Sequence, residues 1–130
     1  MIAYRWIDPQ PADVTVPSAT AFDVLLGDKA AQHYLIDLRV ADADAMAALN
    51  QQYRSVNDPT DVLSFPLFES VDALPNTDAP LGDIVICPAM MDAEHLSETE
   101  IIEHGVLHLL GFDHETDQIG WNTARQQLTK

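Results

Sequence analysis

The chain has 130 residues, close to the usual size of one domain, so we expect a single compact core. Hydrophobic residues make up 47% of the sequence, which excludes a disordered chain, and no apolar run is long enough to span a bilayer. Lysine and arginine total 6 against 21 aspartates and glutamates, a formal net charge of −15, so the chain lacks the material for an extended basic nucleic-acid-binding surface.

This acidity has two interpretations that the composition leaves open. Repulsion between like charges keeps a protein soluble. An excess of acidic side chains is also an adaptation to concentrated salt, where charges are screened beyond roughly 3 Å at about 1 M.

The expected compartment follows from the N-terminus and from cysteine usage. The first residues, MIAYRWIDPQ, lack the basic and apolar segments of a signal peptide. Cys87 is the single cysteine, so no internal disulfide can form. Both features predict a cytoplasmic protein.

The first half of the chain predicts two strands and two helices. Residues 2–7 form the first strand, and Tyr34–Val40 the second, with largely alternating apolar and polar side chains. Ser18 is placed to cap a helix that ends at Gly27, and Asp42 is placed to cap the next helix.

The second half of the chain predicts two further strands and several helices, one of which is long and apolar. Pro88 suits the first turn of a helix, and Ser97 with Glu100 forms a capping box for a helix that runs to about Leu110. The remaining predicted elements are a strand over 62–65, a loop over 70–80, a strand over 82–87 and a final helix over 115–128. Strands and helices in this order predict an α+β fold, one domain over residues 1–130 with a small mixed β-sheet packed with helices.

Three histidines near the C-terminus form the strongest chemical pattern. His104 and His108 are four residues apart on the predicted helix, which places them on one face about 6 Å apart. Gly111 then ends the helix and allows the chain to return His114 to the same point. We therefore expect a metal site at the end of a buried helix, where the helix dipole favours positive charge.

Three neutral imidazoles leave the fourth position of a tetrahedral zinc open, which is typical of a catalytic site in a metallohydrolase domain. Imidazole also suits nickel, copper or iron, so zinc is the first choice among several divalent transition metals. His33 and His95 fit no such pattern, and we expect them to be surface or packing residues.

The pattern differs from the zinc-peptidase motif H-E-x-x-H, because Gly105 stands where that motif has its general base. Glu103 precedes the first histidine and is expected to point about 100° away from it around the helix. Asp113 is placed either to orient a ligating histidine or to cap the exit of the helix.

The sequence HGVLHLLGFDHE, residues 104–115, closely resembles the signature of the YbeY family of ribosomal RNA maturation factors. Two further stretches resemble the same family: LNQQYRSVNDPTDVLSFP, residues 49–66, and LGDIVIC, residues 81–87. Together they lie in the second two-thirds of the chain, in the order of the family. Two departures are a short stretch between Cys87 and His104 and a curtailed C-terminal segment.

The resemblance implies a metal-dependent endoribonuclease that acts on single-stranded RNA, in maturation of the small-subunit rRNA 3′ end and in ribosome quality control. It also implies a three-histidine zinc site formed by His104, His108 and His114, and a functional role for Arg54. From the residues alone, Arg54 is either a clamp for phosphate oxygens or a surface arginine that the helix dipole favours.

Three functions are therefore expected, and the first is preferred. The chain is a single-strand-specific metallo-endoribonuclease that hydrolyses phosphodiesters, with rRNA and a ribosomal partner, and with weak RNA binding of its own because of its charge. The alternatives are a metal-dependent hydrolase of a small anionic ester or amide, and a ribosome-associated factor that acts through a partner protein.

Overall fold

The structure, a computed structural model, describes residues 1–12, 14–91 and 97–128. The strands are β1 (Ile2–Trp6), β2 (Tyr34–Val40), β3 (Val62–Pro66) and β4 (Ala79–Ile86). The α-helices are α1 (Asp23–Leu26), α2 (Ala43–Arg54), α3 (Glu98–Leu109) and α4 (Gln118–Leu128). Short 3-10 helices are η1 (Gly27–Ala31), η2 (Val71–Ala73) and η3 (Pro88–Met90).

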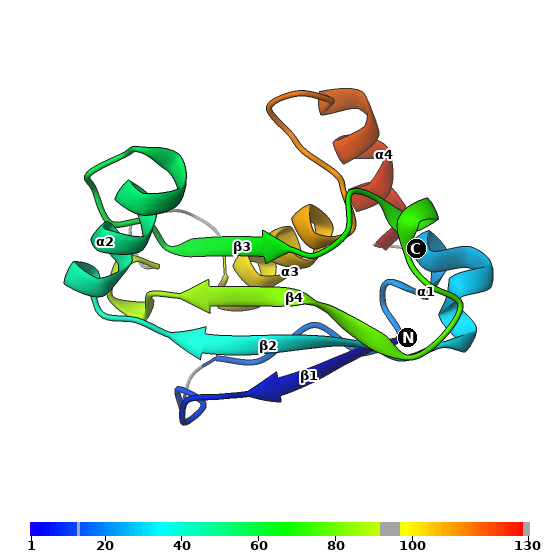
Figure 1. Cartoon of the computed structure of the whole chain (residues 1–130), viewed down its shortest axis with the longest axis horizontal. Coiled ribbons are helices and arrows are strands. Elements are labelled where there is room, and N and C mark those ends of the chain that lie inside the picture. Colours follow the sequence, from blue (N-terminus) through cyan, green and yellow to red (C-terminus); the bar gives the residue numbers. More distant parts are fainter. Residues whose placement is uncertain (13, 92–96, 129–130) are drawn as a thin grey trace.

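The strands form one mixed sheet in the order β1-β2-β4-β3 (Figure 1). Strands β1, β2 and β4 are parallel, and β3 runs antiparallel to β4 at the edge of the sheet. The predicted α+β fold with a small mixed sheet is confirmed. The antiparallel edge strand matters for function, because its outer side is free to line a cleft.

The helices lie on both faces of the sheet. The main core lies between the sheet and helices α1, α3 and α4; its largest fully buried side chains include Phe22, Ile36, Leu38, Ile84, Ile86, Ile101, Ile102 and Leu107. A smaller cluster lies under α2 on the other face and contains Met46, Leu63, Val85 and Cys87. No helix in the described part of the chain is both long and apolar enough to cross a membrane.

Two of the three predicted helix caps, Asp42 and Ser97, are confirmed. The Asp42 carboxylate accepts a hydrogen bond from the backbone N–H of Ala45 at 2.8 Å and begins α2. The Ser97 hydroxyl accepts one from the backbone N–H of Glu100 at 3.2 Å and begins α3. Each cap satisfies a backbone donor that the first turn of a helix leaves without a partner.

The helix predicted from Ser18 to Gly27 is wrong in its first part. Residues 18–22 form turns, and an α-helix exists only over Asp23–Leu26 before Gly27 takes a positive φ of 58°. The Ala19 carbonyl, which a continuous helix would use internally, accepts a hydrogen bond from the N–H of Ile2 at 3.1 Å. Pairing with the N-terminal strand therefore replaces the first helical turn.

Two elements begin three residues away from the predicted position, β4 earlier and α4 later. Strand β4 begins at Ala79 and thus includes Pro80, which the sequence predicts to lie in the preceding loop. Pro80 is tolerated in the strand because the pairing with β2 shifts register there, so its missing N–H breaks no regular hydrogen bond. Helix α4 begins at Gln118, because the Asp117 carboxylate accepts the N–H of Gly120 at 3.0 Å and caps the helix there.

Candidate active site

Helix α3 carries His104 and His108 on the part of its surface that is not covered by the core. Both side chains are half-buried, one helical turn apart, and face a cleft. The rest of the helix is held by six buried residues: Ile101, Ile102, Gly105, Val106, Leu107 and Leu109. Packing of these residues in the core holds the helix in place, so the two imidazoles are attached to a rigid backbone.

A glycine turn at the end of α3 brings His114 beside His108. The N–H of Phe112 bonds to the Leu107 carbonyl at 3.0 Å and that of Gly111 to the His108 carbonyl at 3.1 Å, the pattern of a Schellman cap. Gly111 has a φ of 97°, and a Cβ there would lie 2.5 Å from the backbone oxygen of Glu69. The ring centroids of His108 and His114 are 5.5 Å apart.

Trp121 on α4 contacts all three imidazoles. Its ring centroid lies 5.3 Å from that of His104, 5.0 Å from that of His108 and 5.2 Å from that of His114. The sequence did not predict this contact, because nothing in the local pattern of α4 indicates which buried side chain meets the histidines.

Their surroundings favour the neutral form of His104 and His108 over the charged form. Burial lowers the pKa of His104 and of His108, because the charged imidazolium loses hydration, and the positive charge of Arg125 lowers the pKa of His104 further. The neutral imidazole is the form that binds a metal ion. The buried Nε2 atom of His104 has no hydrogen-bond partner in the described residues.

These side chains fit a divalent transition metal by donor type and by location. Two imidazoles bound to one tetrahedral zinc place their ring centroids about 5 Å apart, close to the 5.5 Å between His108 and His114. The three rings surround the Trp121 indole, and among the described residues no set of three His, Cys, Asp or Glu side chains is already arranged to hold an ion. Binding of an ion therefore requires the rings to turn.

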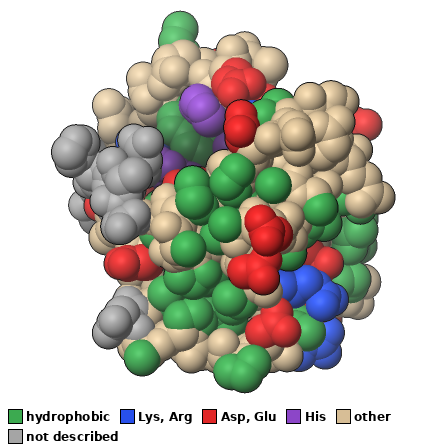
Figure 2. Space-filling view, turned by 90° about the vertical axis from the view of Figure 1, so that its left-hand side faces the viewer, with side chains coloured by type: hydrophobic (Ala, Val, Ile, Leu, Met, Phe, Trp, Pro, Cys, Tyr) green, Lys and Arg blue, Asp and Glu red, His purple; other side chains and the backbone are tan. Residues whose placement is uncertain are grey.

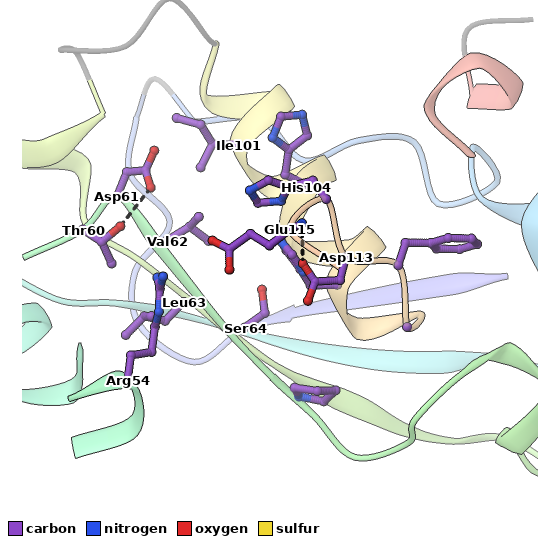
Figure 3. A pocket seen from close by; sticks show the side chains of 15 residues that line it. Arg54, Thr60, Asp61, Val62, Leu63, Ser64, Ile101, His104, Asp113 and Glu115 are labelled. Atoms are coloured by element: carbon purple, nitrogen blue, oxygen red, sulfur yellow. Dashed lines mark hydrogen bonds between the residues drawn. The ribbon is translucent and has the colours of Figure 1, made fainter. Parts of the chain in front are cut away.

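The histidines line a cleft of about 590 Å³ between α3 and the edge of the sheet. Figure 2 shows histidine and acidic side chains gathered at a hollow on one face of the molecule. The wall across from α3 is formed by β3, by residues 60–61 before it and by Arg54 (Figure 3). Asp113 and Glu115 line the cleft from the loop that follows α3.

Arg54 is placed at the cleft by the end of α2. Ser55 takes a left-handed conformation with a φ of 59° and ends the helix, so Arg54 is its last residue. Buried Asn50 donates a hydrogen bond to the Asp58 carbonyl at 2.8 Å and holds the following turn. Arg54 is exposed and makes none of the ion pairs found among the described residues, so its guanidinium is available to a ligand.

Gly105 stands where the zinc-peptidase motif has its glutamate, and close packing against the sheet leaves little room for a side chain at this position. A Cβ there would lie 3.0 Å from the Ile84 side chain and 3.2 Å from the Ser64 hydroxyl, which itself donates to the Gly105 carbonyl at 3.3 Å. Helix α3 therefore lies tightly on the sheet. Glu103 does not line the cleft, as predicted, and burial raises the pKa of its carboxyl group.

The Asp113 side chain forms a local hydrogen bond in the loop between Gly111 and α4. Its carboxylate accepts the N–H of Glu115 at 2.9 Å, and this hydrogen bond lowers the pKa of Asp113. Among the described residues, the Asp113 side chain makes no hydrogen bond to an imidazole, and its bond to Glu115 holds the loop after α3 and does not cap the helix itself. His33 is an exposed surface residue, with its Nδ1 atom 3.7 Å from Asp78, and His95 lies outside the described residues.

Comparison with known proteins identifies the family. The model of the family described as endoribonuclease YbeY matches residues 18–127. A relative named endoribonuclease YbeY from Azorhizobium caulinodans is 32% identical over 117 residues, which is 84% of this chain and 72% of the relative.

Further relatives with that name are more similar over a shorter stretch. One from Acinetobacter baumannii is 43% identical over 90 residues, and one from Legionella pneumophila 42% over 92, covering 62% and 64% of this chain. The chain spans 57% of the length of each of these two relatives.

Among solved structures, the solution structure of TM1509 from Thermotoga maritima is 22% identical and covers 98% of this chain and 87% of its own, with a TM-score of 0.42. That likeness is too low to carry an argument. The family model covers most of the chain, and its named members are hydrolytic nucleases. The chain belongs to the endoribonuclease YbeY family.

Proposed function

We propose that this chain is a single-strand-specific metallo-endoribonuclease of the cytoplasm. Its proposed task is maturation of the small-subunit rRNA 3′ end and ribosome quality control. Membership of a family of metal-dependent nucleases supports this proposal. The observation that carries it is the cleft itself, which has three histidines on one wall and, on the other, Arg54, which makes no ion pair with a described residue.

His104, His108 and His114 are the proposed metal ligands. The ring contacts around Trp121, the lowered pKa values of His104 and His108 and the unpaired Nε2 atom of His104 support this assignment. A bound divalent ion, with zinc as the first choice and nickel as another, supplies Lewis acidity and positive charge at the scissile phosphate.

Arg54 is the proposed catalytic and substrate-binding residue. Its planar guanidinium can donate two parallel hydrogen bonds to phosphate oxygens and stabilise the negative charge that develops as the phosphodiester is cleaved. Arg54 lies across the cleft from the histidines, so the proposed site of the phosphate is between them (Figure 3). A single strand suits this site, because one phosphate must reach both walls.

The acidity supports a helper protein for RNA binding. The cleft holds Asp61, Asp113 and Glu115 beside a single arginine, and the whole chain has a net charge of −15. The carboxylates in the cleft and the negative charge of the whole chain both repel the phosphate backbone of RNA. We therefore propose that the chain meets RNA on the ribosome or through a ribosomal protein, which supplies the missing positive charge.

The test is cleavage of an end-labelled single-stranded RNA by the untagged chain, with a duplex of the same sequence beside it. The compared samples are wild type, wild type with chelator, wild type with zinc restored, His108→Ala and His33→Ala. His33→Ala is the matched control, because His33 is exposed and outside the cleft. We expect cleavage of the single strand only, lost with chelator and with His108→Ala, and retained in His33→Ala.

The other outcomes separate the alternatives. Cleavage that survives both chelator and His108→Ala would show a contaminating nuclease and overturn the three-histidine mechanism. No RNA cleavage, combined with zinc-dependent hydrolysis of a small phosphate ester, would favour the small-substrate hydrolase. An inactive chain that gains activity on ribosomal particles would favour the partner-dependent factor.

A further inference from the structure

Trp121 is the one aromatic residue in the described chain that touches every proposed ligand. Its ring centroid lies between 5.0 and 5.3 Å from those of the three imidazoles. The side chain is only 4% exposed and does not line the cleft, although all three histidines do. The indole therefore contacts the imidazoles from within the main core and not from the cleft.

Among the described residues, the only other ring contact that these imidazoles make is the one between His108 and His114. Metal-binding histidines usually donate their second ring N–H to a carboxylate or carbonyl group, which fixes the ring. No described residue makes such a hydrogen bond to His104, His108 or His114, and the buried Nε2 of His104 is unpaired. Contact with the indole is the interaction that the three rings share.

Helix α4 holds the indole in place through few contacts. Trp121 and Ala124 are its buried residues. Its start is fixed by the Asp117 cap, and the N–H of Asp117 bonds in turn to the Asp113 carbonyl at 2.9 Å. The turn that delivers His114 and the helix that delivers Trp121 are thus directly joined.

We propose that Trp121 is a positioning residue that keeps the three imidazoles together by aromatic packing and limits how far they turn as an ion binds. The inference rests on the proposed metal site and goes beyond it. Edge-on and tilted contacts between rings favour particular orientations, so one indole restricts all three ligands together. Removal of the indole frees the rings, and the ion then has to order them as it binds.

The test measures zinc binding by the full-length chain rather than RNA cleavage. Zinc affinity is read by competition with a chromophoric chelator, and the cobalt-bound protein is compared by its visible absorption spectrum. We expect Trp121→Ala to weaken zinc binding roughly tenfold to a hundredfold, the usual effect of losing a group that orients a ligand. Trp121→Phe keeps an aromatic ring and should recover much of the affinity.

A fluorescence experiment locates the effect. In a Trp6→Phe background, Trp121 is the single tryptophan, and zinc should change its emission. The change should be absent in a Trp6→Phe, His108→Ala chain. Ala124→Gly is the matched control, because it loosens α4 at its other buried residue without touching an imidazole, and its zinc affinity should stay within about twofold of wild type.

The outcomes distinguish this inference from the proposed function. Wild type that binds no zinc in equilibrium dialysis would overturn the metal site and the inference with it. Zinc binding that depends on His108 but is unaffected by Trp121→Ala, with unchanged emission, would overturn the inference alone. An equal loss of affinity in Ala124→Gly would also overturn it, because general loosening of α4 would then explain the effect. If Trp121→Ala does not fold, Trp121→Phe and the emission change decide the question.

Discussion

Tyr4, which is half-buried, and Tyr34, which is buried, lie on neighbouring strands and differ in one hydrogen bond. The Tyr34 hydroxyl donates to the Pro75 carbonyl at 2.7 Å, whereas the buried Tyr4 hydroxyl has no partner among the described residues. Burial and the nearby charge of Glu103 raise the pKa of Tyr4. A buried hydroxyl without a partner loses its hydration and gains nothing in return.

Tyr4→Phe should therefore stabilise the protein by about 1 kcal/mol, and Tyr34→Phe should destabilise it by a similar amount. Because the pKa of Tyr4 is raised on folding, the unfolded chain loses this proton first, and stability falls as pH rises above about 10. Tyr4→Phe should reduce that alkaline loss. Urea unfolding at pH 7.5 and pH 10.5 measures both effects, and a less stable Tyr4→Phe at pH 7.5 would show that the hydroxyl has a partner.

Arg54 offers a second test at the scale of one residue. Arg54→Ala should lower single-strand cleavage by about 10²- to 10³-fold, as loss of a donor to developing negative charge does, with little change in stability. The cleavage rate of Arg54→Lys should lie between those of wild type and Arg54→Ala, because an ammonium group keeps the positive charge but cannot donate two parallel hydrogen bonds to a phosphate.

The matched control for Arg54 is Arg39→Ala, because Arg39 lies 3.6 Å from Asp83 and outside the cleft. Single-turnover cleavage rates, with Tm as a check on folding, measure the effect. Equal rates in wild type and Arg54→Ala would leave Arg54 as a surface residue at a helix end.

At the scale of elements, the two ends of α3 should respond differently to substitution. Gly111→Ala forces a side chain into a left-handed conformation and within 2.5 Å of the Glu69 carbonyl, so it should cost well over 1 kcal/mol and displace His114. Ser97→Ala removes the cap at the other end and should cost about 1 kcal/mol without affecting zinc affinity. Thermal unfolding and zinc competition test the pair, and equal zinc affinity in both variants would contradict this account of Gly111.

The elements also show what the sequence could and could not predict. Local chemistry predicted α3 and its cap at Ser97, since a cap depends on residues three apart. It failed at Ser18 because the Ala19 carbonyl bonds to Ile2, a partner far away in the chain. It also missed Trp121, because contact between α4 and the imidazoles depends on how two helices pack. The position of His104 and His108 on one face of α3 could be predicted because their spacing on one helix is itself local.

At the scale of the whole molecule, the net charge of −15 opposes folding at low salt. Only four ion pairs occur among the described residues, and each has at least one partner whose side chain is exposed by 40% or more, so they offset little of this repulsion. Added salt screens like charges over shorter distances, from about 10 Å at 0.1 M to about 3 Å at 1 M. The folded state, which brings the charges together, gains more from screening than the expanded chain does.

We therefore expect Tm to rise by several degrees between 0.1 M and 1 M KCl, with most of the rise at the lower concentrations. An equal osmolality of glycine betaine serves as the control, because it is excluded from the protein surface without screening charge. A flat Tm in KCl would show that self-repulsion is already negligible. An equal rise in both solutes would assign the effect to solute exclusion, and the acidity would then have no role in stability.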